Sequence, residues 1–141
     1  MTFPGNKALR SLALAALLLG VEPLHAEYLK IELRVYGLDC ELCARGVAAS
    51  VQRLPGVKSI DVSLRKGLLE IVLERGNKFK MSDLRKRIRE NGFRSMEATV
   101  TAIGDFTEPS KFEVVGSGES YEVGAHDPKD HGLVELTFHV K

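Results

Sequence analysis

Gly37-Leu38-Asp39-Cys40-Glu41-Leu42-Cys43-Ala44 holds both cysteines of this 141-residue chain. The stretch follows a run from Leu29 to Tyr36 in which apolar and polar residues alternate, which is typical of a half-buried strand. It opens a segment whose apolar residues recur at helical spacing. We therefore expect a strand, a short loop and a helix that begins at the cysteines.

A helix N-terminus stabilises thiolates, because its free N–H groups and its dipole favour negative charge. Two thiolates at this spacing suit Cu(I), or Zn(II) with further ligands, so Cys40 and Cys43 are candidate metal ligands. A structural disulfide and a thioredoxin-like redox pair remain open for the same two residues. A zinc ribbon would need a second cysteine pair, which the chain lacks.

The rest of the central region predicts alternating elements. A helix over 41–54, stopped by Pro55-Gly56, precedes a hairpin of two strands over 59–65 and 69–74 that turns at Lys66-Gly67. A second helix begins after Ser82 as its N-cap and ends before Gly92, and a strand follows over 96–102. The order strand, helix, strand, strand, helix, strand predicts an α+β, ferredoxin-like βαββαβ fold with one solvated sheet face.

The cysteine stretch, together with Val47, Val51, Leu54-Pro55-Gly56-Val57, Asp61-Val62 and Gly92-Phe93, resembles the heavy-metal-associated domain over residues 28–103. That family includes copper metallochaperones, the periplasmic mercury-binding protein and N-terminal modules of metal-pumping ATPases. The family usually has Met where this chain has Leu38. The resemblance implies that this side chain faces the core, where Leu is tolerated.

The resemblance also bears on two neighbours of the cysteines. An acidic residue before the first cysteine, here Asp39, resembles modules of zinc-, cadmium- and lead-pumping ATPases, in which the carboxylate joins the thiolates. Alternatively, Asp39 only caps the helix that begins at Glu41. By resemblance Phe93 shields the sulfurs, and it also fits a core residue at the start of the last strand.

Both ends of the chain differ from this central region. Residues 1–26 read as a signal peptide, because basic Lys7 and Arg10 precede the apolar run Ser11–Val21, and Ala26 offers a cleavage site. Leu24 is not the small residue preferred before such a site, so an uncleaved anchor is the alternative. The prediction is therefore an exported, periplasmic protein with a heavy-metal-associated domain over 27–103 and no membrane span after cleavage. Residues 104–141 follow a break at Gly104–Pro109 and predict a β-rich extension docked on that domain.

Charge is unevenly divided between the two mature parts. Residues 27–103 carry 15 basic and 10 acidic side chains, and residues 104–141 carry 3 and 8. The basic run of Lys78, Lys80, Arg85, Lys86, Arg87, Arg89 and Arg94 could dock an acidic partner, face solvent or meet the acidic extension. A formal net charge of +1 and the absence of Trp give no reason to expect a nucleic-acid partner. A second metal site from His126, His131 and His139 with Asp127 and Asp130 is a further possibility.

These patterns predict a protein that holds one soft or borderline ion, Cu(I), Zn(II) or Hg(II), between Cys40 and Cys43, with Asp39 as a possible third ligand. It would pass the ion to a metal transporter or a metal-accepting domain. We expect no enzyme, because neither a nucleophile–base pair nor a phosphate loop is visible. The alternatives are a periplasmic thiol–disulfide redox or sensor protein that uses the same cysteines, and an interaction module that binds through the extension.

Overall fold

The computed structural model describes residues 27–125 and 132–141, so the predictions for residues 1–26 and 126–131 lie outside the described part. The elements are β1 (Tyr28–Tyr36), α1 (Glu41–Gln52), β2 (Val57–Ser63), the 3₁₀ turn η1 (Leu64–Lys66), β3 (Leu68–Leu73), α2 (Met81–Glu90), β4 (Arg94–Glu108), β5 (Lys111–Val114), β6 (Glu119–Glu122) and β7 (Val134–Val140). The first six helices and strands confirm the α+β, ferredoxin-like order.

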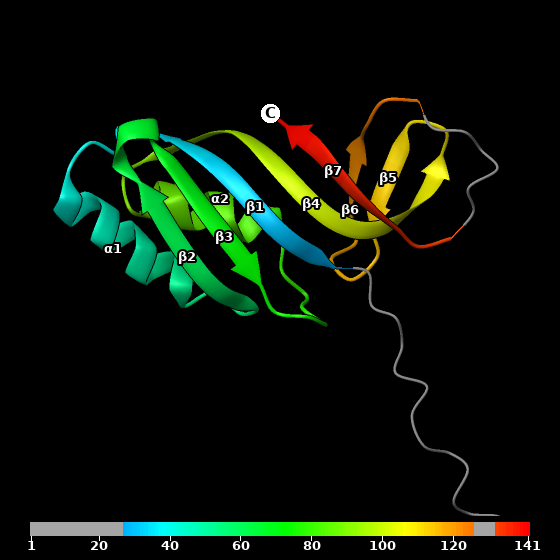
Figure 1. Cartoon of the computed structure of the whole chain (residues 1–141), viewed down its shortest axis with the longest axis horizontal. Coiled ribbons are helices and arrows are strands. Elements are labelled where there is room, and N and C mark those ends of the chain that lie inside the picture. The colour runs from blue at the N-terminus through cyan, green and yellow to red at the C-terminus, as the bar shows by residue number, and fades with distance from the viewer. Residues whose placement is uncertain (1–26, 126–131) are drawn as a thin grey trace, which may run out of the picture.

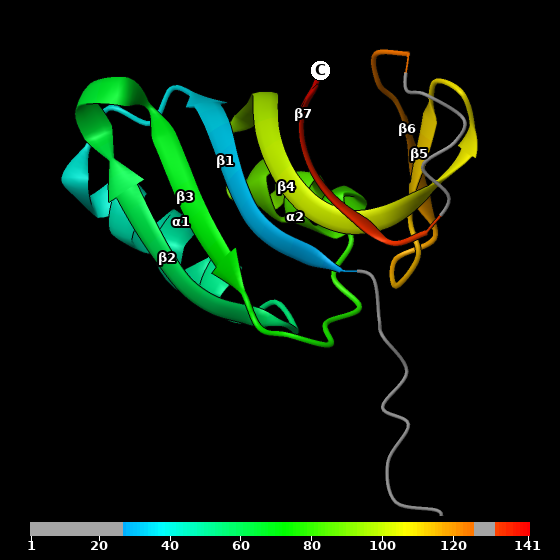
Figure 2. The same ribbon diagram turned by 45° about the vertical axis from the view of Figure 1, so that its right-hand side comes forward.

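The strands lie side by side in the order β2-β3-β1-β4-β5-β6, and β7 pairs with β4. Each of these described pairs is antiparallel. Both helices lie on one face of the β2-β3-β1-β4 part, and the β5–β6 hairpin stands at the end remote from α1 (Figures 1 and 2). The other face carries charged pairs such as Arg34 with Glu97, 3.4 Å apart. The predicted solvated sheet face is therefore confirmed.

The core lies between the sheet and the helices. Ile31, Leu33 and Val35 of β1 are buried, and they alternate with side chains on the polar face. Helical spacing predicts apolar stripes on both helices, and most of their members are buried, with Ala44 beside them: Val47, Val51, Leu54, Met81, Leu84 and Ile88. The prediction is wrong for Leu42, whose side chain is 80% exposed because it lies on the solvent side of the first turn of α1. Burying each large apolar side chain stabilises the fold by about 1.5–3 kcal/mol, and this helix–sheet contact holds the cysteine loop in place.

Strand β4 corrects the predicted break at Gly104–Pro109, because it runs unbroken for 15 residues through Gly104 to Glu108. The glycine permits close packing instead of ending the strand. A Cβ at Gly104 would lie 2.2 Å from the carbonyl oxygen of Glu113 and 2.6 Å from the Phe112 ring. β4 therefore crosses the predicted domain boundary at 103/104 and pairs with β1 and β7 as well as with β5.

The extension is β-rich, as predicted, and consists of a hairpin and a last strand. β5 and β6 pair through the turn that contains Gly116-Ser117-Gly118, and β7 adds to β4 from Ala98 to Gly104. Phe112 and Val114 are fully buried, and the Phe112 and Phe138 rings meet edge to face with centroids 5.5 Å apart. The docked β-extension thus has apolar contacts of its own.

The predicted N-cap of α2 at Ser82 is wrong. Lys80 occupies the N-cap position without a side-chain bond, and the carboxylate of Glu119 in β6 accepts the N–H groups of Met81 (2.7 Å) and Ser82 (3.1 Å). The free N–H groups of a helix can be satisfied by any nearby acceptor, including one distant in sequence. The extension therefore caps α2.

Glu119 also binds two tyrosines. The Tyr28 hydroxyl donates to its carboxylate at 2.5 Å and lies 2.6 Å from the Tyr121 hydroxyl. Burial raises the pKa of Tyr121 to about 12, and burial together with the bond to Glu119 raises the pKa of Tyr28 well above its usual range. Burial disfavours the Glu119 carboxylate, but the donors outweigh burial and lower its pKa.

The basic run does not pair with the extension through ion pairs in the described part of the chain. Lys86 and Arg87 instead lie 4.0 and 3.5 Å from Glu90 of their own helix. Arg85 donates to the backbone carbonyls of Met96 and Lys141, each at 3.2 Å. The contact between body and extension therefore depends on the β4–β7 pairing, the Arg85–Lys141 hydrogen bond, Glu119 and apolar packing.

Candidate metal-binding loop

The loop between β1 and α1 is anchored to the core by the side chain of Leu38. Gly37 turns the chain out of β1 with a φ of +85°, a conformation that side-chain-bearing residues rarely adopt. Leu38 then points into the core and is 3% exposed, in the orientation that the family resemblance implies. The two residues leave Asp39 and Cys40 on the exposed side of the loop.

Cys40 occupies the N-cap position of α1. Its Sγ accepts the N–H of Cys43 at 3.0 Å, and its carbonyl accepts the N–H of Ala44 at 2.9 Å, the first helical bond. The hypothesis that Asp39 caps this helix is therefore wrong. The exposed Asp39 side chain makes no hydrogen bond or ion pair with another described residue, and its role as a metal ligand stays a prediction.

Cys40 and Cys43 are joined by a disulfide, with their Cα atoms 5.1 Å apart. This is the oxidised form of the pair, and it is one of the alternatives that the sequence left open. Cys40 is exposed, Cys43 is half-buried, and Leu42 between them is 80% exposed. After reduction, two sulfurs at this separation would lie within reach of one ion and of an approaching partner.

The surroundings of the loop combine aromatic and basic side chains. Phe93 packs against the core, which confirms its interpretation as a core residue, and a Cβ at Gly37 would lie 3.8 Å from its ring, so Phe93 lies beside the loop. Its shielding of the sulfurs stays a prediction. Arg94 lies over the Tyr36 ring, 5.4 Å from its centroid. Sequence reasoning missed this pair, because it depends on the β1–β4 register that places the two residues opposite each other.

An open hollow of about 680 Å³ adjoins the loop on the polar face of the sheet. Asp39, Lys66 and Met96 contribute to its lining, with Arg34 and Tyr36. The hollow keeps one flank of the loop accessible to solvent.

No group of three or more His, Cys, Asp and Glu side chains is arranged to hold a metal ion in residues 27–125 and 132–141. Of the second predicted metal site, His126, Asp127, Asp130 and His131 lie outside the described residues. His139 hydrogen-bonds through Nδ1 to the Thr99 hydroxyl at 3.1 Å. In the same described ranges, none of the helices is long and apolar enough to cross a membrane.

Two comparisons with known proteins identify the family of this chain. A family model for the heavy-metal-associated domain matches residues 32–94. The copper chaperone CopZ of Bacillus subtilis (strain 168) is 30% identical over 61 residues, which cover 43% of this chain and 87% of CopZ. The chain belongs to the heavy-metal-associated domain family and has its metallochaperone-like, metal-binding fold.

Solved structures of similar proteins align with about half of the chain. A copper binding domain from HMA7, a P-type ATPase, is 28% identical with a TM-score of 0.45, over 48% of this chain and 90% of that one. Oxidized MerP from Ralstonia metallidurans CH34 is 22% identical with a TM-score of 0.45, over 49% and 94%.

Proposed function

We propose that this protein is an exported metal-binding protein that holds one soft ion between reduced Cys40 and Cys43 and passes it to a partner. The observation that carries the proposal is the placement of both cysteines on an exposed loop at the N-terminus of α1, with their Cα atoms 5.1 Å apart. The partner would be a metal transporter or a metal-accepting domain whose own thiolates enter the coordination shell.

Metal uptake requires the reduced pair. Reduction of the disulfide takes up two electrons and two protons from an external thiol reductant, and metal binding then releases the thiol protons. The N–H of Cys43 and the positive end of α1 favour the Cys40 thiolate. Two thiolates alone suit Cu(I), and the description of CopZ as a copper chaperone supports this ion.

Asp39 is the residue that would widen the choice of ion. Its carboxylate stands next to Cys40 on the exposed side of the loop. A hard oxygen ligand favours a divalent ion such as Zn(II) relative to Cu(I). We propose Asp39 as a third ligand for Zn(II), with Cu(I) and Hg(II) held by the sulfurs.

Native mass spectrometry of the reduced protein with Cu(I), Zn(II) or Hg(II) tests the proposal. We expect one ion per chain, lost in the double variant Cys40→Ser with Cys43→Ser. The oxidised wild-type protein is the matched control, because it has the same sequence without free thiols. Unchanged uptake by the double variant would refute the assignment of the cysteines.

The disulfide itself favours a second candidate, a thiol–disulfide redox or sensor protein. Such a protein would exchange its disulfide rapidly with a small thiol and would have no need of a stable metal complex. Disulfide exchange with glutathione, followed in parallel with metal uptake, separates the two candidates. Fast exchange without metal retention would favour the redox function.

Export is proposed from residues 1–26, in which a basic start precedes an apolar run. N-terminal sequencing of the protein from a periplasmic fraction of a bacterial host tests this proposal. We expect the chain to begin after Ala26, and retention of the uncleaved chain in the cytoplasm would contradict export.

A further inference from the structure

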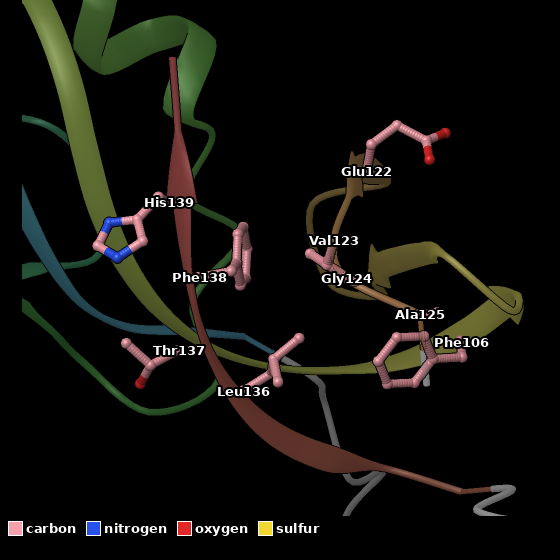
Figure 3. A pocket seen from close by; sticks show the side chains of 9 residues that line it. All are labelled: Phe106, Glu122, Val123, Gly124, Ala125, Leu136, Thr137, Phe138 and His139. Carbon is pink, nitrogen blue, oxygen red and sulfur yellow. The ribbon is translucent and has the colours of Figure 1, made fainter. Parts of the chain in front are cut away.

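A second hollow, of about 460 Å³, lies between β7 and the stretch that follows β6. Its lining consists of Phe106, Glu122, Val123, Gly124, Ala125, Leu136, Thr137, Phe138 and His139. Figure 3 shows Phe106, Leu136 and Phe138 pointing into the hollow, whereas Thr137 and His139 point to the other side of β7. The hollow therefore has an apolar floor between two strands.

Both strands that flank the hollow are edge strands. In the described part of the chain β7 pairs only with β4, and β6 pairs only with β5. The outer edge of β7 offers seven residues of backbone and makes no backbone hydrogen bond to another described residue. Unpaired strand edges are templates for the addition of an extended segment.

The side-chain alternation along these strands defines what such a segment would look like. Leu136 and Phe138 face the hollow. Glu135 is exposed, and strand alternation places it on the opposite face of β7. Glu122 of β6 also points away from the hollow. A strand added to β7 would therefore place every second side chain on the apolar floor and the intervening ones on the face that carries Glu135, Thr137 and His139.

The charge of the region favours a basic segment. Described residues after Ile103 carry six acidic side chains and two basic ones, and five of the six acidic ones remain when Glu119, which is bonded to α2, is set aside. Lys111, one of the two basic residues, lies 3.7 Å from Glu108. We propose that the outer edge of β7 binds an extended segment of a partner protein in which apolar residues alternate with Lys or Arg, by strand addition over the hollow.

This surface is separate from the cysteine loop. The loop adjoins the start of β4, where Arg94 pairs with Tyr36, while the hollow includes Phe106 near the other end of the same strand. A partner bound at β7 thus leaves both cysteines accessible. Strand addition and metal binding are expected to be independent.

A synthetic peptide of alternating valine and lysine, as long as β7, is the probe for the full chain. We expect saturable one-to-one binding, followed by amide chemical shifts, with the changes concentrated in β7. Leu136→Lys places a charge on the apolar floor and should weaken binding by about tenfold. The matched control is Leu64→Lys, the same exchange at a 38% exposed residue in η1, which should bind as the wild type does.

A charge reversal provides an independent readout at an exposed residue. Glu135→Lys should weaken the valine–lysine peptide by about threefold and strengthen an alternating valine–glutamate peptide by a similar factor, as expected for cross-strand charge pairs. Equal binding of both peptides by this variant would overturn the charge argument.

Three further outcomes would overturn the proposal. The first is the absence of saturation by about 1 mM peptide. The second is self-association that Leu136→Lys abolishes, which would make a second copy of this chain the occupant. The third is peptide binding only after residues 1–26 are cleaved from the intact chain, which would make that segment the occupant.

Discussion

Replacing Glu119 by Gln tests whether the extension and the body form one stable unit. The carboxylate accepts from the Tyr28 hydroxyl and from two N–H groups at the start of α2. Hydrogen bonds to a charged group contribute about 1.5–3 kcal/mol, and a negative charge at a helix N-terminus adds about 0.3–1 kcal/mol. Because Gln keeps one acceptor oxygen, we expect a loss of about 2 kcal/mol in the free energy of unfolding.

Urea denaturation at neutral pH measures this loss, and Glu122→Gln is the matched control. Glu122 lies on the same strand, is exposed, and has one side-chain hydrogen bond, from Ser110. Its exchange should change stability by less than about 0.5 kcal/mol. In thermal unfolding the Glu119 variant should melt about 6 °C below the wild type.

The contribution of Glu119 to the free energy of unfolding should depend on pH in a defined direction. The pKa of Glu119 in the folded protein is lowered from its ordinary value of 4.5. The stabilisation is therefore fully present above about pH 4.5 and is lost as the pH falls through the folded pKa. The stability gap between wild type and Glu119→Gln should shrink in acid, and a gap that is absent at pH 7 or constant down to pH 2 would refute the reasoning.

Three further changes test the close packing at β4, the loop anchor and the choice of ion. Gly104→Ala should cost about 3 kcal/mol in thermal unfolding, because its Cβ would meet the Glu113 carbonyl oxygen at 2.2 Å; unchanged stability would contradict that contact. Leu38→Ala should cost about 2–4 kcal/mol in urea denaturation and loosen the loop, and a neutral result would argue against its anchoring role. Asp39→Ala should weaken Zn(II) more than Cu(I) in a competition titration, and equal effects on both ions would remove Asp39 from the ligand set.

The central fold could be predicted because each element carries a local signal. Ile31, Leu33 and Val35 alternate with polar residues, and Leu84 and Ile88 recur at helical spacing, so each burial pattern is visible within a few residues. Gly37 and Gly92 take the left-handed conformations expected of loop and helix-end glycines. The cysteine motif indicated the family for the same reason, since its spacing is local.

The errors arose where a distant residue determines local structure. Serine is a residue type favoured at N-caps, which is why the sequence predicts an N-cap at Ser82. The carboxylate that accepts the first N–H groups of α2 instead belongs to Glu119, which lies 38 residues from Met81 in sequence. Glycine is common at strand ends, but Gly104 lies inside β4, where its missing side chain leaves room for the backbone of β5. Neither contact leaves a periodic signal in the sequence, because both depend on how the hairpin folds back onto the body.

The unbroken course of β4 determines how the chain can be dissected in the laboratory. A truncation after residue 103 would sever this strand, strip β7 from its edge between Ala98 and Gly104, and leave the start of α2 without its carboxylate. Such a fragment would expose the unpaired backbone edge of β4, which can pair with other molecules, and is expected to aggregate. Weak metal binding by this fragment would then reflect its misfolding and aggregation, and it would give no information about the cysteines as metal ligands.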